Sequence, residues 1–216
     1  MELNRLLEHT LLRPEASGAD IIRLCVEAKR FNLYSVVVNP CRVKLAAQEL
    51  AGTGIQVCSV VGFPLGAGHS ETKIAEAVAA ESDGATEIDA VANIGWLCEG
   101  RFEQAEDEIR RLRAALKRKT ILKIIIETPL LPAGSWAEAV AAVIAGGADY
   151  VKSATGFFGV TPPDHIQRLK AIGGERIRIK AAGGIKTAAQ AMAMIQAGAA
   201  RLGSSSSVAI MTGPRP

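Results

Sequence analysis

The sequence predicts a single-domain α/β protein: a (β/α)8 TIM barrel that occupies residues 1–216 and begins with a short N-terminal helix. Hydrophobic residues make up 49% of the chain and aromatic residues only 4%. The apolar side chains are therefore mostly aliphatic, as in buried parallel strands and the helices that cover them. Short β-branched runs alternate with Ala-rich stretches of helical period along the chain, and three of these stretches end in the same Gly-Ala step.

The strands are predicted from short apolar runs between turn residues. Seven such runs lie at residues 35–39, 56–61, 86–91, 121–127, 149–153, 176–180 and 200–203. Helical patterns lie between them at residues 72–82, 102–118, 136–145, 163–171 and 187–196. An eighth strand is needed to close a barrel, and it is assigned to residues 8–11. A doubly wound open sheet would explain the alternation nearly as well.

The Gly-Ala step recurs where predicted helices give way to strands, at Gly84, Gly147 and Gly198. Glycine suits a helix C-cap because it adopts the left-handed backbone conformation without strain. Counting five residues on from each glycine gives Asp89, Lys152 and Gly203. The equal spacing predicts equivalent heights near the carboxyl ends of three strands, where barrel enzymes build their active sites. This repeat favours the barrel over the open sheet.

Composition and spacing argue against several classes of protein. No apolar run approaches the ~18 residues of a membrane span, and the charged segment 1–8 lacks the apolar stretch of a signal peptide. A cytoplasmic protein with no membrane partner is expected. The formal charge of +3 is too small and too dispersed to predict a nucleic-acid partner. The widely spaced cysteines and histidines predict neither disulfides nor a metal site.

Lys152 and Lys180 are candidate catalytic residues for imine chemistry. Lys152 lies in an apolar run and Lys180 ends another, so neighbouring barrel strands would crowd two ammonium groups into one cavity. Burial and a like-charged neighbour lower the pKa of a lysine from ~10.4 toward ~7–8. The neutral amine forms a Schiff base with aldehydes and ketones, and this imine is an electron sink for carbon–carbon cleavage. Alternatively, both lysines extend from strand ends to solvent.

Asp89 also lies within an apolar run. A buried carboxylate is costly unless it is paired, and the nearby lysines would supply its partner. Asp89 could then move a proton to and from a hydroxyl group or water. A structural salt bridge with Lys180 is the alternative, and the two roles are compatible. A third lysine, Lys123, is expected in a buried ion pair, with Glu127 on the same strand face reaching toward the mouth of the barrel.

Two loops rich in glycine and serine follow the last two predicted strands, and each leads toward a helix. Their candidate binding residues are Gly183, Gly184, Lys186, Gly203, Ser204 and Ser205. Loops at these places in a barrel commonly bind phosphate through backbone N–H groups, and Lys186 would add a positive charge. We therefore expect a small phosphorylated substrate, with ordinary turn formation as the alternative.

Several short motifs occur together and in a fixed order along the chain. They include residues 8–12 (EHTLL), 60–66 (VVGFPLG), 87–89 (EID), 147–152 (GADYVK), 155–157 (TGF), 180–185 (KAAGGI) and 203–205 (GSS). Taken together, these motifs resemble the deoxyribose-phosphate aldolase family over almost the full length of the chain. Single motifs such as the Gly-Gly step are not specific, but the ordered set is.

The resemblance implies a barrel fold and a class I aldol reaction that needs neither a metal nor another cofactor. The implied reaction is the reversible cleavage of 2-deoxy-D-ribose 5-phosphate to D-glyceraldehyde 3-phosphate and acetaldehyde, in deoxyribonucleotide catabolism. Lys152 falls on the family's Schiff-base lysine, Lys180 on the second lysine that perturbs it, and Asp89 on the proton-relay aspartate. The two Gly/Ser loops fall on the phosphate site, and Thr155 is assigned to substrate binding beside it.

Some positions depart from the family pattern. Glu8 stands where an aspartate is usual, Ser153 and Ala154 replace a common Thr-Ser pair, and Lys186 replaces a common arginine. Some members carry a C-terminal tyrosine that assists proton transfer, whereas this sequence ends in residues 213–216, GPRP.

Two other functions fit the same residues. One is an imine-forming aldolase or lyase that acts on another phosphosugar, and the other is a non-catalytic barrel that binds a phosphometabolite. Asp89, Lys152 and Lys180 favour catalysis, because a purely binding protein has no use for two crowded lysines. The sequence does not fix the oligomeric state, and a homo-oligomer is compatible with it.

Overall fold

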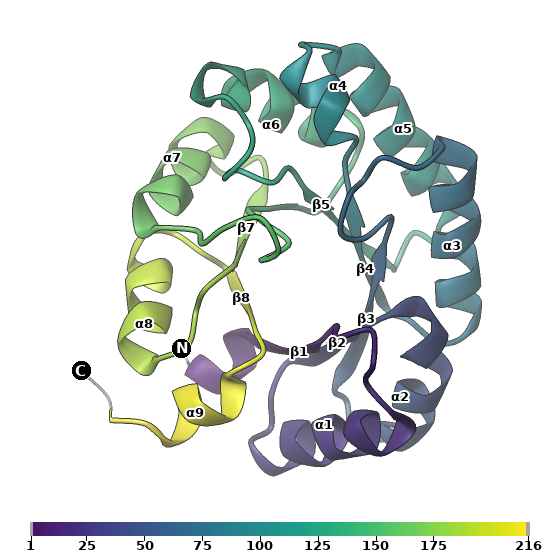
Figure 1. Ribbon diagram of the computed structural model, residues 1–216, viewed down its shortest axis with the longest axis vertical. Helices are drawn as coiled ribbons and strands as arrows, with labels where there is room; N and C mark the ends of the chain where they lie inside the picture. Colours follow the sequence, from purple (N-terminus) through teal and green to yellow (C-terminus); the bar gives the residue numbers. More distant parts are fainter. Residues whose placement is uncertain (1, 215–216) are drawn as a thin grey trace.

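Eight parallel strands form a closed barrel in the computed structural model, which describes residues 2–214 (Figure 1). In chain order, which is also their order around the barrel, the strands are β1 (Leu7–Leu11), β2 (Ser35–Val38), β3 (Gln56–Val61), β4 (Glu87–Val91), β5 (Ile121–Ile125), β6 (Tyr150–Lys152), β7 (Arg178–Ala182) and β8 (Arg201–Ser204). Strand β8 pairs with β1, with Gly203 opposite Glu8. The predicted barrel is therefore confirmed, and the open sheet is wrong.

Helices surround the barrel, as the strand–helix alternation predicts (Figure 1). They are α1 (Gly18–Arg30), α2 (Val43–Glu49), α3 (Ser70–Ser82), α4 (Ile94–Cys98), α5 (Phe102–Ala115), α6 (Trp136–Ala145), α7 (Pro163–Gly173), α8 (Ala188–Gln196) and α9 (Ser207–Thr212). Short 3-10 helices are η1 (Leu3–Leu6), η2 (Pro40–Arg42) and η3 (Ala133–Ser135), and η1 is the predicted N-terminal helix. Among residues 2–214, none of the helices has the length and apolar character to cross a membrane.

The start of β7 differs from the prediction, since the strand comprises Arg178–Ala182 rather than residues 176–180. The chain is still turning after α7, and the Arg176 N–H donates to the Gly173 carbonyl at 3.2 Å. Pairing with β6 begins only where Arg178 lies opposite Tyr150. Lys180 consequently lies in the middle of its strand and not at its end.

The predicted helical patterns do not include α1, α2 or α4. Helix α1 begins with a capping box, in which the Ser17 Oγ accepts from the Asp20 N–H (3.2 Å) and the Asp20 carboxylate accepts from the Ser17 N–H (2.9 Å). Ser17 and Asp20 have the spacing of a capping box in the sequence, so the start of α1 could have been predicted from them. Helices α2 and α4 are only 7 and 5 residues long, too short to display a helical period.

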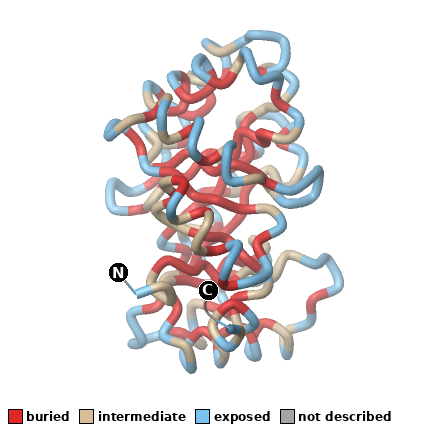
Figure 2. The backbone as a smooth tube through the Cα atoms, turned by 90° about the vertical axis from the view of Figure 1, so that its left-hand side faces the viewer, coloured by how far each residue is buried: buried red, intermediate tan, exposed pale blue. Residues whose placement is uncertain are grey.

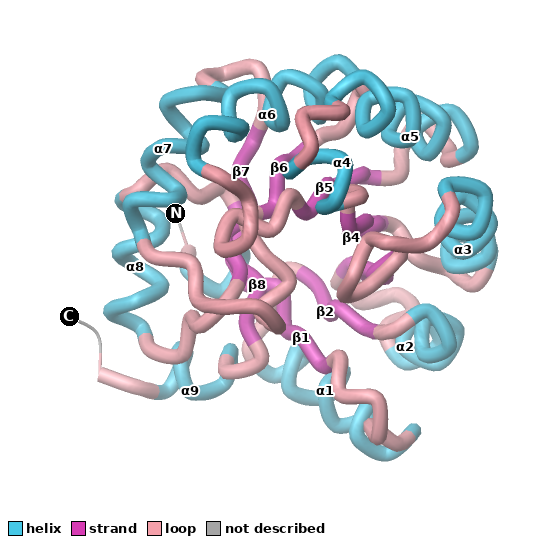
Figure 3. Tube along the Cα trace, turned by 45° about the horizontal axis from the view of Figure 1, so that its top comes forward, coloured by secondary structure: helices cyan, strands magenta, loops and turns pink. Residues whose placement is uncertain are grey.

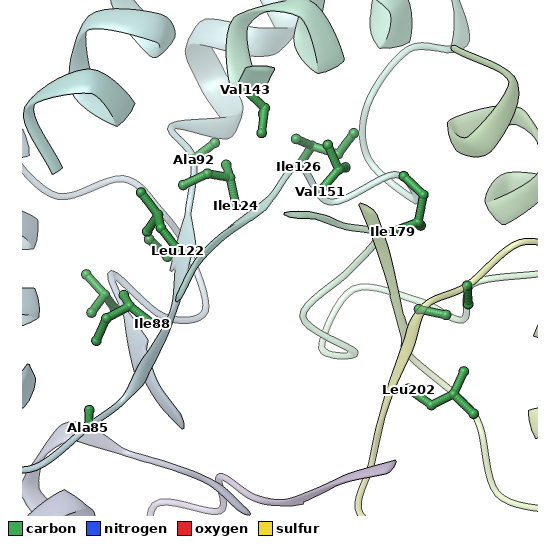
Figure 4. Packing of buried hydrophobic residues seen from close by; sticks show 14 of the residues in the cluster. Ala85, Ile88, Ala92, Leu122, Ile124, Ile126, Val143, Val151, Ile179 and Leu202 are labelled. Carbon is green, nitrogen blue, oxygen red and sulfur yellow. The ribbon is translucent and has the colours of Figure 1, made fainter. Parts of the chain in front are cut away.

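Apolar side chains on the outer face of the barrel form the main core. Ile88, Leu122, Val151, Ile179 and Leu202 lie between the strands and the surrounding helices and are at most 1% exposed (Figure 4). Figure 2 shows that the strands are buried and that exposure is concentrated in the loops and on the outer faces of the helices. Since side chains alternate across a strand, the residues next to these core positions point into the barrel.

The inward-pointing positions are unusually polar for a protein interior. Asp89 follows Ile88, Lys123 follows Leu122, Lys152 follows Val151 and Lys180 follows Ile179. A small apolar cluster of Val37, Cys58 and Val60 also belongs to the interior. The alternation that builds the main core therefore also gathers four charged side chains inside the barrel.

Candidate active site

Asp89 of β4 is the centre of a buried charge cluster inside the barrel. Its Oδ1 lies 3.0 Å from the Nζ of Lys123 on β5. Its Oδ2 is shared by Lys152 on β6 at 2.8 Å and by Lys180 on β7 at 2.6 Å. The four side chains are at most 4% exposed. The alternative in which Lys152 and Lys180 extend to solvent is therefore wrong.

The neighbouring lysines hold Asp89 as a carboxylate. Burial alone would raise the pKa of Asp89, but attraction to Lys123, Lys152 and Lys180 outweighs burial and keeps this pKa well below its usual range. The Cys58 thiol, 3.2 Å from Oδ1, adds a further donor. Asp89 is thus a fixed negative charge among three ammonium groups.

Lys180 is held as a cation between two carboxylates. Its Nζ lies 2.5 Å from Glu8 and 2.6 Å from Asp89. Burial lowers the pKa of an ammonium group, but attraction to Asp89 and Glu8 prevails here and raises the pKa of Lys180 above its usual value. Glu8 therefore retains an ion pair with Lys180 in place of the usual aspartate.

Lys152 differs from Lys180 in both charge preference and access. Burial has the largest effect on the pKa of Lys152 and lowers it; attraction to Asp89 opposes this shift, and repulsion from Lys180 adds to it. The resulting pKa lies below the usual value for lysine, as the sequence predicts. Lys152 also lines the cavity at this end of the barrel. Lys152 thus borders the cavity and has a lowered pKa.

Lys123 forms the expected buried ion pair, but with several acids. Its Nζ contacts Glu87 and Asp89 and lies 3.4 Å from Glu8. The Tyr34 hydroxyl donates to Glu87 at 2.6 Å. Burial would lower the pKa of Lys123, but attraction to Asp89 and its other acidic neighbours raises it well above the usual value. Lys123 is therefore a structural cation beneath the cavity.

Glu8, Cys58 and Asp89 place possible metal ligands within 4.8 Å of one another. Lysine ammonium groups already lie among them, however. The Lys180 Nζ bonds both carboxylates, and the Lys123 Nζ lies 3.0 Å from Asp89 and 3.5 Å from the Cys58 sulfur. The positive charge that these acids require is thus supplied by lysines, which makes the trio a poor fit for a metal ion.

A cavity of about 280 Å³ opens above Lys152 at the carboxyl ends of the strands. The loops that follow β1, β6, β7 and β8 line it, and Figure 3 shows loops gathered around the barrel opening. All the predicted substrate- and phosphate-binding residues are in its wall: Thr155, Gly183, Gly184, Lys186, Gly203, Ser204 and Ser205. Asp89 and Lys180, with no exposed surface, lie deeper in the barrel behind Lys152.

Gly183 and Gly184 shape the wall after β7. Their φ angles of +102° and +81° lie in the region that favours glycine. A Cβ on Gly184 would stand 2.6 Å from Val160 in the loop after β6. The two loops therefore pack closely only because these residues lack side chains, and the peptide backbone itself forms the cavity surface.

The serine residues after β8 have different roles. The Ser204 hydroxyl donates to the Ile185 carbonyl (2.6 Å) and accepts from the Ser206 N–H (2.9 Å). It therefore ties the loop after β8 to the loop after β7. Ser205 and Lys186 are exposed beside the cavity, where a ligand can reach them.

Two parts of the cavity wall were not predicted from the sequence. One is the end of β1 and its loop, residues 10–13, and the other is Phe157. Both lie in or next to motifs that carry the family resemblance, but the motifs alone assign no role to either. Thr10 and Arg13 could have been predicted from their position, because they are polar residues close to the carboxyl end of a strand, where barrel enzymes build their sites.

Two of the residues that depart from the family pattern, Ser153 and Ala154, directly follow Lys152 in the chain. The Ser153 hydroxyl contacts the Ala182 carbonyl and the Thr161 hydroxyl, each at 3.1 Å, so it fastens the loop after β6 to β7. Ala154 is fully buried. Residues 215–216 of the C-terminal segment lie outside the described residues.

Fold and site together define a barrel enzyme that works at the carboxyl ends of its strands. Residues 8–212 match the model of the DeoC/LacD family of aldolases, and the chain belongs to this family.

The chain is similar to the deoxyribose-phosphate aldolase of Bacillus cytotoxicus, with 44% identity over 213 residues that cover 98% of this chain and 95% of the relative. A solved aldolase called QR15 superimposes with a TM-score of 0.93 at 33% identity, and the match covers 97% of this chain and 94% of that one. The deoxyribose phosphate aldolase of Aeropyrum pernix, described as a unique tetramer, has a TM-score of 0.88 at 29% identity, with coverage of 97% and 89%. The predicted family resemblance is confirmed.

Proposed function

We propose that this protein is a class I aldolase of deoxyribonucleotide catabolism that reversibly cleaves 2-deoxy-D-ribose 5-phosphate to D-glyceraldehyde 3-phosphate and acetaldehyde. The observation that carries the proposal is the position of Lys152. Of the three lysines in the buried cluster, Lys152 alone lines the cavity, and its pKa is lowered. The similarity to deoxyribose-phosphate aldolases of nearly equal length supports the choice of substrate.

The proposal places the open-chain substrate in the cavity in one orientation. Its phosphate on C5 would bind at the backbone of Gly183 and Gly184, next to the positive charge of Lys186. The aldehyde at C1 would then lie at Lys152. Thr155 lies in the wall with these residues, and its hydroxyl accepts from the Phe157 N–H (3.1 Å). The hydroxyl proton of Thr155 remains available for a sugar oxygen.

The reaction begins with the neutral amine of Lys152. It attacks C1, and the carbinolamine loses water to give a protonated imine. A base then removes the proton of the C3 hydroxyl, the C2–C3 bond breaks, and its electron pair moves toward the imine nitrogen to form an enamine. D-Glyceraldehyde 3-phosphate leaves. Protonation of C2 and hydrolysis of the imine release acetaldehyde and restore the amine.

Asp89 and Lys180 prepare Lys152 and move protons. The Asp89 Oδ2, 2.8 Å from the Lys152 Nζ, can relay the proton that Lys152 gives up to water in the cavity and then remains a carboxylate. Lys180 bonds the same oxygen, and its charge disfavours a second ammonium group beside it. The pair can pass protons to and from a water molecule or a substrate hydroxyl group in the cavity.

Borohydride trapping during incubation with 2-deoxyribose 5-phosphate tests the proposal. Intact mass and peptide mapping should locate a reduced two-carbon adduct on Lys152, and Lys152→Ala should yield none. Release of acetaldehyde is measured in a parallel incubation without borohydride, because borohydride would reduce the free aldehyde. A protein that forms no adduct and releases no acetaldehyde would refute the proposed function.

We also infer a cytoplasmic homo-oligomer. All four cysteines are free, which is expected in a reducing compartment. The Aeropyrum pernix relative is described as a tetramer, which supports self-association. Light scattering on the purified protein tests this inference, and a monomeric mass would contradict it.

A further inference from the structure

The charged residues in the wall of the cavity above Lys152 are all basic. They are Arg13, Lys152 and Lys186, and among residues 2–214 no aspartate or glutamate belongs to the wall. The proposed reaction uses Lys152 as a neutral amine, so Arg13 and Lys186 remain as the positive charges of the wall. A phosphate monoester carries about two negative charges near neutral pH. Two cations therefore match its charge, whereas Lys186 alone matches about half of it.

Arg13 and Lys186 lie on the two loops that flank the loop after β8. Strand β8 lies between β7 and β1, and Ser204 near its end pairs with His9 (Figure 1). The loop after β1 therefore begins beside the loop after β8, and Arg13 is the second residue after β1. All three loops contribute to the cavity wall. A phosphate group bound at the loops after β7 and β8 thus has Lys186 on one side and Arg13 on the other.

The backbone of the loop that carries Arg13 is held by neighbouring elements. The Asn39 side-chain amide donates to the Leu12 carbonyl (3.3 Å), and the Arg42 guanidinium donates to the Ala16 carbonyl (2.8 Å). Within the loop, the Ala16 N–H donates to the Arg13 carbonyl (3.1 Å). These bonds fix the backbone of Arg13 at the edge of the cavity, so only its side chain has to adjust to a ligand.

The guanidinium group of Arg13 has donors left for an anion. Within the described part of the chain, its only side-chain hydrogen bond runs from Nη1 to the Glu15 carboxylate (2.8 Å). The two side chains are 60% and 65% exposed, and an ion pair in solvent stabilises little. Glu15 is not part of the cavity wall. Because a guanidinium group has five N–H donors in a planar fork that matches phosphate, Arg13 can bind a phosphate group with or without Glu15.

We propose that Arg13 is a specificity-determining residue that binds the phosphate group of the substrate opposite Lys186. The inference rests on the proposed function, in which this phosphate lies at the backbone of Gly183 and Gly184. The two cations come from different loops and hold the phosphate between them, at the distance from Lys152 that the open-chain sugar spans. A sugar without a phosphate group loses both contacts, so Arg13 favours phosphorylated substrates.

Steady-state kinetics with and without the phosphate group tests the role of Arg13. Arg13→Ala should raise the KM for 2-deoxyribose 5-phosphate roughly tenfold, as expected for a lost hydrogen bond between charged groups. The KM for 2-deoxyribose should not change. Arg13→Lys keeps the positive charge and should raise the KM for the phosphorylated sugar less than Arg13→Ala does. An unchanged KM in Arg13→Ala, or equal changes for both sugars, would overturn the inference.

Two control variants separate phosphate binding from support of the loop. Arg23→Ala removes an arginine that is 66% exposed and paired with Asp20, but is not part of the cavity wall, and it should leave both KM values unchanged. Glu15→Gln breaks the ion pair of Arg13 but keeps the guanidinium group, so it should not weaken phosphate binding. A rise in KM for Glu15→Gln as large as that for Arg13→Ala would show that the ion pair supports the loop, and would overturn the inference.

A 31P NMR titration with inorganic phosphate tests the same contact without turnover. Arg13→Ala should raise the dissociation constant of phosphate roughly tenfold, and Arg23→Ala should not change it. This measurement separates the two proposals. A wild-type protein that does not cleave 2-deoxyribose 5-phosphate, but binds phosphate through Arg13, refutes only the proposed function. Normal cleavage together with unchanged phosphate binding in Arg13→Ala refutes only the role of Arg13.

Discussion

Lys152 and Lys180 are bonded to the same carboxylate oxygen, yet their surroundings shift their pKa values in opposite directions. Lys180 has a second carboxylate, Glu8, at 2.5 Å, whereas Lys152 relies on Asp89 alone and borders the cavity. One additional acid therefore decides which amine keeps its proton. The arrangement supports the proposal that Lys152, the lysine that borders the cavity, is the nucleophile.

Replacement of Lys180 by leucine should raise the pKa of Lys152. The change removes a repelling charge and leaves Asp89 to attract Lys152 with one competitor fewer. The neutral amine forms as the pH rises through the pKa of Lys152, so the acid limb of the kcat/KM profile should move to higher pH and turnover near neutrality should fall. A pH–rate profile measures this shift, with the exposed Lys119→Leu as control. An unmoved limb in Lys180→Leu contradicts the role of Lys180.

Lys186→Ala should weaken the binding of phosphorylated substrate. A lost contact to a charged group of about 1.5 kcal/mol corresponds to a rise in KM of roughly tenfold. The KM for 2-deoxyribose, which has no phosphate, should not change. Steady-state kinetics with both sugars measures the difference. Equal effects on both sugars would show that Lys186 supports the loop and does not bind phosphate.

At the residue scale, the sequence predicted which charged residues belong to the cluster, but it did not predict all the residues with which they form ion pairs. Lys152, Lys180 and Asp89 stand out because polar residues are rare in apolar strands. The contact between Lys180 and Glu8 joins positions 172 residues apart, and it exists only because β8 closes onto β1. Such contacts depend on strand register and barrel closure, which no local pattern encodes.

At the scale of elements, the Gly-Ala steps build the same junction three times. The glycines have φ angles of +111°, +83° and +106° at Gly84, Gly147 and Gly198. In each case the following alanine N–H donates to a carbonyl five residues earlier, at 3.0 to 3.2 Å. The repeat in the sequence is therefore a repeat in hydrogen bonding. It was predictable because the junction is local, whereas the delayed start of β7 depends on its pairing with β6.

Gly84→Ala should destabilise the junction between α3 and β4. The new Cβ would lie 2.7 Å from the Ala47 Cβ, in a backbone conformation that alanine avoids. We expect a loss of about 1–3 kcal/mol in the free energy of unfolding. Gly52→Ala is the control, because Gly52 has φ +75° but no atom within 4 Å of the place that a Cβ would occupy. Urea denaturation of both variants measures the difference, and equal losses would show that the Ala47 contact is unimportant.

At the scale of the whole molecule, the barrel has an apolar shell around a charged centre. Ile88 and its equivalents pack against the helices, while Asp89 and three lysines face one another inside. This separation follows from strand alternation, which places the main apolar core and the charged cluster on opposite faces of the same strands. It also makes stability sensitive to the charge of Asp89.

Asp89→Asn should reduce stability by about 3 kcal/mol at neutral pH, since one partner of a buried charge cluster is lost. The folded pKa of Asp89 lies below its unfolded value of 3.8, so the carboxylate stabilises the fold above that pH and this stabilisation is lost as the pH falls below it. The stability difference between the wild-type protein and the variant should therefore shrink in acid. Urea denaturation at several pH values tests this, and a constant difference would contradict it.

The enclosed cluster has a consequence for the balance of charge. Three carboxylates, those of Glu8, Glu87 and Asp89, contact the three lysine side chains. When Lys152 is a free amine, the formal sum inside the barrel is one negative charge in excess. A protonated imine on Lys152 restores neutrality, and a neutral enamine exposes the excess again. In the proposed reaction, the protein interior thus acts as a built-in counter-ion that favours each step in which positive charge forms on Lys152.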